Sequence, residues 1–454
     1  MKYLKTLQGL VKLLSTTLQP TQPFNVFLSQ TQPTQASQKT MDTKIQFKIG
    51  MIGPTGSGKT SLISAICSEV QERLSNDPQM EFWPDGTLTQ EAMKRAEAAF
   101  DTAINSPLFQ VPELANTADL WEYKFAITLP AGQDIGFSIL DYPGRKLGTA
   151  EFSHDVTPHL LESAALFVPI SSDILMYWND TKNLHDEFNA KCNMAANLML
   201  DCNNVDKCIR NWIGEKKRIG APAQLFFVPI KCEKYFDDNG GYSDNHQKLH
   251  EAVLERYVNS LGLTAKDKQL IQVNVYYVDT YGVVELRNIK AESRENGDLK
   301  LVPTFQRRND QGKRRRTKNA YELLMNILKF QVENRFNLQR VETEKQADDY
   351  RESEEMAKQC RRDYEAAQEK LKAHNDSYTW WDTFWYTWIG TDKKKKALED
   401  NVWRTSTDRN VASNTAANIK NTYLLSKQQC ETLEKAVRKL TSLLQTMENR
   451  QYTL

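Results

Sequence analysis

Apolar and polar residues alternate with two different periods between residues 42 and 282, and these periods predict strands and helices in turn. The alternating apolar positions Ile45, Phe47, Ile49 and Met51 predict a buried strand. Further strands are predicted at 121–129, 135–140, 164–170, 223–230 and 271–278, and helices at 61–66, 89–104, 173–203 and 246–261. Because strands and helices alternate, the pattern predicts an α/β fold with a mostly parallel sheet and helices on both faces.

The last third of the chain carries a heptad pattern instead. Mostly apolar residues recur from Leu398 to Met447 in alternating steps of four and three, with Arg409 and Ser426 filling two of the steps, and the pattern is strongest after Tyr423. Residues 319–373 carry a patchier seam with the same period. Two long helices joined by one loop predict an antiparallel coiled-coil hairpin.

These patterns divide the chain into four parts. We expect a leader at 1–41, an α/β domain at 42–282 with an insertion at about 71–116, a basic linker at 283–318 and the helical hairpin at 319–454. The leader contains no Asp or Glu and begins with a short basic amphipathic pattern. A transit-like segment, a surface anchor and an upstream extension before Met41 are alternatives, and we favour a disordered, non-catalytic leader.

Composition narrows the class of protein. The 454 residues carry a net charge of +1, so no nucleic-acid partner is expected from the overall charge. A solvated linker is favoured over a phosphate or nucleic-acid site for the basic run at 307–316. The seven cysteines are scattered without metal-binding spacing, which favours reduced thiols in a cytoplasmic protein. No apolar run reaches the roughly 18 residues needed to span a bilayer.

The first predicted strand runs directly into a glycine-rich stretch, and a predicted helix follows it. Glycines allow backbone N–H groups to cradle a triphosphate, and a helix N-terminus adds its positive dipole end. The Lys side chain of such a stretch can reach the β- and γ-phosphates, and the hydroxyl after it can bind Mg²⁺. The sequence therefore predicts a phosphate-binding P-loop. Its residues are Gly53, Pro54, Thr55, Gly56, Ser57, Gly58, Lys59, Thr60 and Ser61.

A second motif, Asp-x-x-Gly, closes the strand predicted at 135–140. Asp141 stands where a carboxylate can bind Mg²⁺ through water, and Gly144 can offer its N–H to a γ-phosphate. Thr117 lies just before the strand at 121–129, where a switch threonine would close over Mg²⁺ and the γ-phosphate, and Thr87 is the rival position.

Together, the stretch 53–60, the motif 141–144 and Lys231 to Glu233 resemble the Ras-like, translation-factor (TRAFAC) class of P-loop GTPases over roughly residues 44–282. The resemblance looks closest to the bacterial double-GTPase-like branch, which is found in conflict or defence gene clusters. It implies a three-layer P-loop NTPase fold, GTP and Mg²⁺ as ligands, and metal contacts from Thr60, Asp141 and Thr117. By the same resemblance, Lys231 would lie along the guanine ring and Glu233 would pair with its N1–H and N2–H₂.

Three departures from that family matter. The segment 230–233 lacks the usual Asn and has Glu233 in place of Asp, so ATP stays an alternative to GTP. Arg145 stands where many relatives place a Gln that orients water; it could stabilise transition-state charge or face solvent. The motif at 278–280 matches the family's last loop only loosely. We therefore expect slow intrinsic hydrolysis, with a partner or a second copy of the chain completing the site.

The loop between the two long helices is rich in aromatic residues. Residues 378–390 contain Trp380, Trp381, Trp385 and Trp388, and four lysines follow at 393–396. Three interpretations remain equal: a membrane-touching tip, aromatics that pack against the protein itself, and a contact surface for a protein partner.

Three functions follow from these patterns. The leading hypothesis is a slow GTP-hydrolysing switch that transmits its nucleotide state to a coiled-coil arm and, through it, to a protein partner. The alternatives are a P-loop ATPase and a scaffold that binds nucleotide without turnover.

Overall fold

The computed structural model describes most of the chain after the expected leader. The described residues are 45–75, 77–105, 120–129, 132–236, 243, 245–282, 284–293, 299–307, 317–379, 382, 392–445 and 452–453. The expected leader 1–41, the candidate Thr117 and residues 380–381 and 383–390 of the Trp-rich segment lie outside them.

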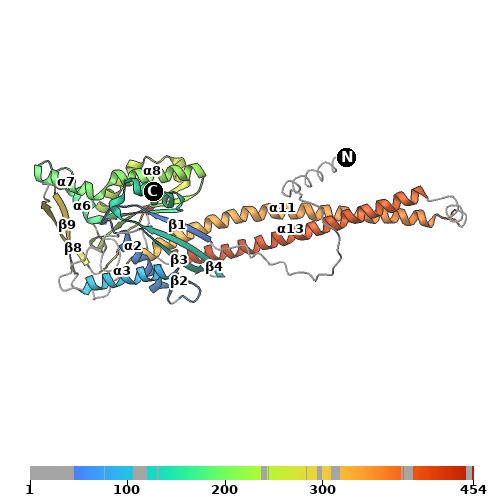
Figure 1. The fold of residues 1–454 in the computed structure, drawn as a ribbon, viewed down its shortest axis with the longest axis horizontal. Helices are drawn as coiled ribbons and strands as arrows, with labels where there is room; N and C mark the ends of the chain where they lie inside the picture. The colour runs from blue at the N-terminus through green and yellow to red at the C-terminus, as the bar shows by residue number, and fades with distance from the viewer. Residues whose placement is uncertain are drawn as a thin grey trace. The chain divides into compact units, whose positions relative to one another are not determined.

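An eight-stranded sheet forms the centre of the α/β part (Figure 1). Its spatial order is β10 (Tyr452–Thr453), β7 (Ile271–Val275), β6 (Ala223–Ile230), β5 (Ala165–Ser171), β1 (Ile45–Met51), β4 (Gln133–Asp141), β3 (Trp121–Leu129) and β2 (Glu81–Pro84). The five strands from β7 to β4 are parallel, whereas β3, β2 and β10 add to the two edges in antiparallel pairing. The predicted α/β class with a mostly parallel sheet is confirmed.

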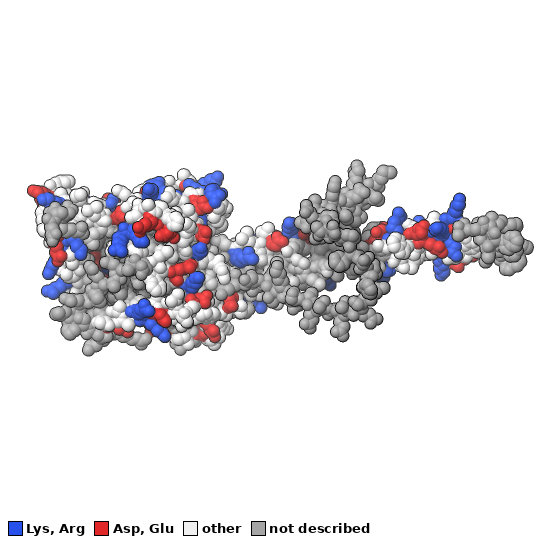
Figure 2. Space-filling view, viewed as in Figure 1, with Lys and Arg blue, Asp and Glu red and all other residues white. Residues whose placement is uncertain are grey.

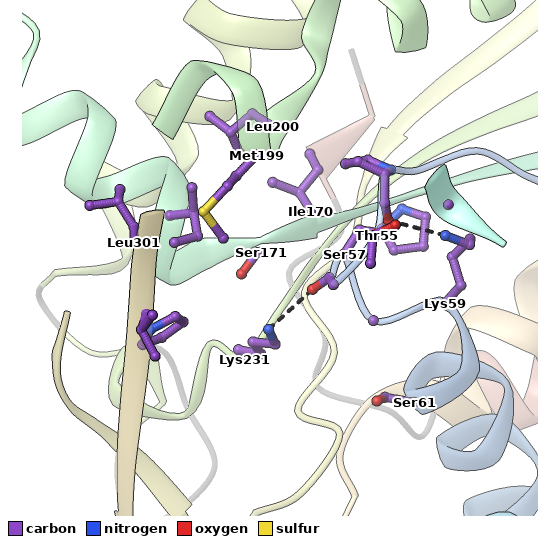
Figure 3. Close-up of a pocket in the computed structure, with 18 of the residues that line it drawn as sticks. Thr55, Ser57, Lys59, Ser61, Ile170, Ser171, Met199, Leu200, Lys231 and Leu301 are labelled. Atoms are coloured by element: carbon purple, nitrogen blue, oxygen red, sulfur yellow. Dashed lines mark hydrogen bonds between the residues drawn. The ribbon is translucent and has the colours of Figure 1, made fainter. Parts of the chain in front are cut away.

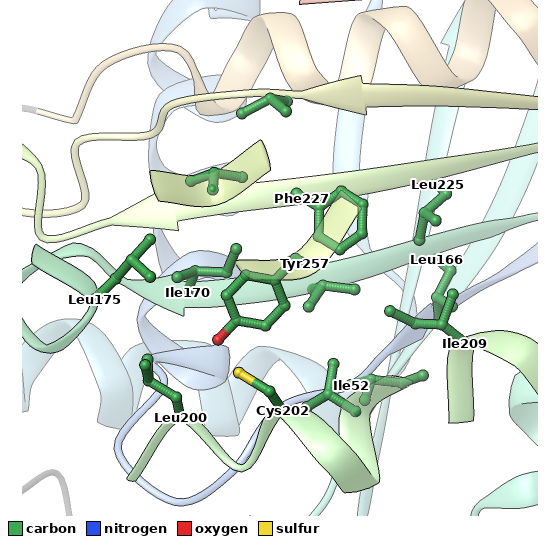
Figure 4. Packing of buried hydrophobic residues seen from close by; sticks show 14 of the residues in the cluster. Ile52, Leu166, Ile170, Leu175, Leu200, Cys202, Ile209, Leu225, Phe227 and Tyr257 are labelled. Atoms are coloured by element: carbon green, nitrogen blue, oxygen red, sulfur yellow. The ribbon is translucent and has the colours of Figure 1, made fainter. Parts of the chain in front are cut away.

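Helices cover both faces of this sheet, because successive residues of its central strands enter different cores. Leu225 and Phe227 of β6 belong to one core, whereas Phe226 and Val228 belong to the other. Figure 4 shows the first core, where Tyr257 and Ile209 pack over β5 and β6. Its helices are α4 (Ala150–Asp155), α5 (Thr157–Glu162), α6 (Ser172–Thr181), α7 (Glu187–Leu200), α8 (Cys202–Ile219), α9 (His246–Val253) and the π-helical turn η4 (Leu254–Val258). Two further short elements are η5 (Asn259–Leu261) and α10 (Ala265–Leu270).

The second core joins the opposite face of the sheet to the long helices. It contains residues of α2 (Lys59–Leu74) and α3 (Thr87–Asn105), together with Leu324 and Leu328 of α11 (Ala320–Asp376). Leu433 and Leu440 near the end of α13 (Lys393–Gln445) are buried in the same cluster. The bases of both long helices therefore belong to the α/β core.

Beyond that core, α11 and α13 pair with each other in antiparallel orientation (Figure 1). Gln339 donates to the Ser426 hydroxyl at 2.8 Å, and farther along the pair the Arg409 guanidinium lies 4.2 Å from the Tyr364 ring centroid. Every predicted seam position of α13 from Leu398 to Leu444 is buried or half-buried, which confirms the heptad pattern.

Several stretches differ from the sequence analysis. The helix expected at 173–203 is divided into α6 and α7, and α8 was not predicted. The insertion expected at 71–116 contributes the edge strand β2 to the main sheet, and Pro84 is the last residue of that strand. The stretch 283–318, expected to be a solvated basic linker, contains the antiparallel pair β8 (Val284–Ser293) and β9 (Leu299–Arg307). Leu301 of this pair is fully buried, so packing holds the hairpin in place despite its basic composition.

Charged side chains of both signs are interspersed on the face shown in Figure 2. No described helix combines the length and the apolar character that crossing a bilayer requires.

Candidate functional site

A glycine-rich loop at 53–58 connects β1 to α2 at the carboxyl ends of the parallel strands. Gly56 and Gly58 have φ angles of +79° and +87°, a region that side chains with a Cβ rarely adopt. A Cβ on Gly58 would lie 1.9 Å from the Cδ1 atom of Ile230 on β6. The loop therefore requires glycine at Gly58 for both its backbone conformation and its close approach to β6.

Lys59, the first residue of α2, lies beneath this loop with its side chain buried. Its ammonium group donates to the carbonyl oxygens of Gly53 at 2.8 Å and Pro54 at 3.1 Å. Burial lowers the pKa of Lys59 to about 8, and the nearby charge of Asp141 partly opposes that change. An anion in the loop would restore the stabilisation that burial removes from this ammonium group.

The next residue links α2 to the end of β4. The hydroxyl of Thr60 donates to Oδ2 of Asp141 at 2.6 Å, and Asp141 is fully buried. Both groups offer oxygen atoms, which Mg²⁺ prefers as ligands. The described residues hold no group of three or more His, Cys, Asp or Glu side chains placed for a metal. The pair therefore fits a magnesium ion whose other ligands come from phosphate and water.

The Asp-x-x-Gly motif packs directly against the loop. A Cβ on Gly144 would lie 2.3 Å from the backbone nitrogen of Thr55, so no side chain fits at this position. The buried hydroxyl of Tyr142 accepts a hydrogen bond from the Gly53 N–H at 3.1 Å. The sequence analysis missed Tyr142, because Asp-x-x-Gly leaves its second position open and only burial distinguishes this ring.

Lys231 reaches the loop from the end of β6. Its ammonium group donates to the Gly56 carbonyl at 3.2 Å and lies 5.9 Å from the Phe305 ring centroid on β9. Glu233 follows in the turn η3 (Glu233–Tyr235) and is only 2% exposed. Burial, together with the charges of Asp279 and Asp173, raises the pKa of Glu233 well above its ordinary value.

These groups surround one cavity of about 1040 Å³, a volume sufficient for a nucleotide. Figure 3 shows its two sides, with Thr55 and Lys59 near the loop and Met199, Leu200 and Leu301 opposite them. The opposite wall also carries Arg287 and Lys290 of β8. The sequence analysis missed this wall because it treated 283–318 as a linker.

The structure brings most of the candidate residues together. Pro54, Thr55, Gly56, Ser57, Gly58, Lys59, Thr60, Ser61, Gly144, Arg145, Lys231 and Glu233 all line the cavity. Gly53 and Asp141 contact these residues from beneath through the hydrogen bonds of Lys59 and Thr60. The rival switch residue Thr87 is exposed at the start of α3 and is not among the residues lining the cavity, whereas Thr117 lies outside the described residues.

Comparison with known proteins adds no family to this picture. No family model matches the chain, and no curated protein matches it.

Proposed function

We propose that this chain binds a magnesium–nucleoside triphosphate in the loop at 53–60 and hydrolyses its γ-phosphate, acting as a slow GTP switch. The observation that carries the proposal is the junction of β1, α2 and β4. There, a buried lysine lies beneath a glycine-rich loop and the next hydroxyl bonds to a buried aspartate at 2.6 Å. This arrangement supplies a cation for phosphates and oxygen ligands for Mg²⁺ at one helix N-terminus.

Each part of the site has a distinct role in this proposal. Thr60 and Asp141 would hold the magnesium ion, which neutralises phosphate charge when it is bound. Lys59 would exchange its carbonyl partners for phosphate oxygens, and Gly144 keeps the motif after β4 in contact with the loop. Arg145 is exposed at the cavity and can approach the charge that develops on the phosphates.

A route from the loop to the long helices supports the switch. The helix that starts at Lys59 also carries Glu69, which accepts hydrogen bonds from the first two backbone N–H groups of α11. A displacement of α2 on loss of the γ-phosphate would therefore act directly on the base of α11. The α11–α13 pair would carry this displacement to a protein partner or to a second copy of the chain.

The motif resemblance supports guanine as the base, and the hydrogen bond to the Gly56 carbonyl holds Lys231 beside the loop. Within the described part of the chain no disulfide joins any of the seven cysteines, which supports a cytoplasmic location. A P-loop ATPase is the second candidate, since Glu233 replaces the usual Asp. A scaffold that binds nucleotide without turnover is the third, since no glutamine follows Gly144.

Calorimetric titration with GTP, GDP and ATP, with and without Mg²⁺, tests the proposal. We expect magnesium-dependent triphosphate binding by the wild type, at least tenfold weaker binding by Lys59→Ala, and no change in Lys248→Ala. Lys248 is a suitable control because it is exposed on α9, away from the cavity.

Release of phosphate from bound GTP would then distinguish a hydrolysing switch from a scaffold, and the same assay with ATP would identify an ATPase. A folded wild-type protein that binds none of the three nucleotides would contradict the proposal.

A further inference from the structure

Three buried carboxyl groups meet at the end of the cavity that holds Lys231. They are Glu233 at the start of η3, Asp173 in the first turn of α6 and Asp279 after β7, and they are 2%, 1% and 2% exposed. Each follows the carboxyl end of a different parallel strand, so the topology of the sheet brings them together.

The positive charge near these carboxyl groups is limited. The charge of Lys231 acts on both Glu233 and Asp173, and its ammonium group donates a hydrogen bond to the Gly56 carbonyl. Lys234 on the same turn also acts on Asp173, although its side chain is exposed. Other charged groups approach from neighbouring elements: Glu285 and Arg287 on β8, which packs against η3, and Lys318, whose backbone pairs with Asp279.

The three carboxyl groups differ in their hydrogen bonds: Asp279 accepts hydrogen bonds from the backbone, whereas Asp173 and Glu233 have carboxyl oxygens without a partner among the described residues. Asp279 accepts from the backbone N–H groups of Tyr281 at 3.0 Å and Gly282 at 2.6 Å, which favours its ionised form. Within the described residues, both carboxyl oxygens of Asp173 and the Oε1 atom of Glu233 have no hydrogen-bond partner. Because these carboxyl groups are buried and repel one another, and one of the two nearby ammonium groups is exposed, ionisation of all three is disfavoured.

Glu233 is the one of the three that lines the cavity, and the charges of the other two act on it. The charges of Asp279 and Asp173 raise its pKa in addition to burial, whereas burial raises the pKa of Asp173 to about 6. Burial and the two neighbouring charges therefore favour the protonated form of Glu233.

The protonation state of Glu233 decides which purine edge it can bind. An ionised carboxylate only accepts hydrogen bonds, so it matches the two donors of guanine, N1–H and N2–H₂. A protonated carboxyl group donates once and accepts once, so it matches the acceptor N1 and the donor N6–H₂ of adenine.

We infer that Glu233 contacts the base of a purine nucleotide and is protonated in the ligand-free protein, so that guanine binds only with release of that proton whereas adenine binds without it. This inference rests on the proposed nucleotide site. The proton passes to the solvent, and Glu233 gains one negative charge in the guanine complex. Base preference then depends on pH: GTP gains affinity as pH rises, and ATP does not.

Calorimetry of the full chain with magnesium GTP and magnesium ATP tests this inference, using two buffers of different protonation enthalpy at each pH from 6 to 8. We expect about one proton to be released with GTP and none with ATP. The dissociation constant for GTP should fall by up to about tenfold per pH unit, while that for ATP stays flat. Both nucleotides carry the same triphosphate, so its own protons cancel in the comparison.

Two variants sharpen the test. Glu233→Gln offers one donor and one acceptor at every pH, so ATP binding should persist, GTP binding should weaken at least tenfold and the proton release should disappear. Asp173→Asn removes a neighbouring negative charge and should move the pH dependence of GTP binding down by about one pH unit. Asp173→Asn also provides a readout if Glu233→Gln does not fold. Glu251→Gln, exposed on α9, is the control that should change neither nucleotide.

Equal proton release for GTP and ATP, or a GTP to ATP affinity ratio that does not change with pH, would overturn the inference while leaving the nucleotide site in place. Failure of wild-type protein to bind either nucleotide would instead overturn the proposed function and this inference with it.

Discussion

The carboxylate of Glu69 on α2 accepts a hydrogen bond from the backbone N–H of Ala320, the first residue of α11, at 2.9 Å. The same oxygen accepts from the next N–H at 3.3 Å, and the other carboxylate oxygen pairs with Arg73. A helix begins with N–H groups that lack partners within the helix, and Glu69 satisfies two of them from a distant part of the sequence. The helix after the glycine-rich loop is thereby joined to the first long helix.

Glu69 should make stability depend on pH. Burial raises its pKa from 4.5 to about 7, so the unfolded chain loses this proton at lower pH than the folded protein does. The free energy of unfolding therefore falls as pH rises from 4.5 to 7. Above pH 7 the full loss, roughly 3 kcal/mol for such a shift, applies. Glu69→Gln retains an acceptor for Ala320 and carries no charge, so its stability relative to wild type should increase over that window.

Denaturant unfolding at pH 5, 6, 7 and 8 checks this prediction. Glu72→Gln is the matched control, because Glu72 is exposed on the same helix. A difference between Glu69→Gln and wild type that stays constant with pH would contradict the prediction.

Gly144→Ala should weaken nucleotide binding. Its Cβ would lie 2.3 Å from the backbone nitrogen of Thr55 and 2.4 Å from the carbonyl carbon of Pro54, so the loop must move. We expect at least a tenfold loss of triphosphate affinity and a destabilisation of about 1–3 kcal/mol from overpacking. Calorimetry and thermal unfolding measure the two effects.

Gly214→Ala is the control for Gly144→Ala. Gly214 lies in α8 and a Cβ there meets nothing within 4 Å, so helix propensity should stabilise this variant by about 0.5–1 kcal/mol. Wild-type affinity in Gly144→Ala would show that the motif can move away from the loop without consequence.

Tyr142→Phe should loosen the start of the loop. It leaves the buried N–H of Gly53 without its acceptor, which costs about 1–3 kcal/mol, while the ring keeps its edge-on contact with Phe152. Unfolding should therefore require less denaturant, and triphosphate affinity should fall several-fold. Tyr350→Phe on the long helices is the control, and equal behaviour of the two variants would argue against a role for the Tyr142 hydroxyl.

Leu440→Ala should destabilise the α/β part although the residue belongs to the second long helix. Leu440 is fully buried in the core that contains α2, so its truncation should cost about 2–5 kcal/mol. Leu425→Ala on the same helix should change stability by less than about 0.5 kcal/mol, because Leu425 is 61% exposed. If the protein unfolded in two separate transitions and Leu440→Ala changed only the one with the smaller signal, the long helices and the α/β part would not share a core.

Local patterns predicted much of the sheet and the long helices. The range of β3 is the predicted one, and β6 matches its predicted range at both ends. Period-2 and heptad patterns are formed by residues only a few positions apart. They can therefore be recognised in a single sequence. The same holds for the glycine-rich loop, whose spacing determines its conformation.

Features made by distant residues were beyond the sequence patterns. Glu69 is one of several charged residues on α2, and only the folded protein shows that it meets Ala320. Asp173 stands before an apolar run and carries no motif, so its approach to Glu233 depends on the order of strands in the sheet. The β8–β9 hairpin was missed because its basic and polar residues hide a short apolar set that includes Leu301.

The small strand β10 pairs with β7 at the edge of the main sheet, so the backbone that departs through α11 is fastened again after α13. Each long helix consequently has its own attachment to the same body, one at Leu328 and one at Leu440. A force applied where the two helices are farthest from the sheet would therefore act on the α/β core at two attachment points. A helix pair with two attachment points can transmit a rotation as well as a pull. A single attached helix cannot transmit the rotation.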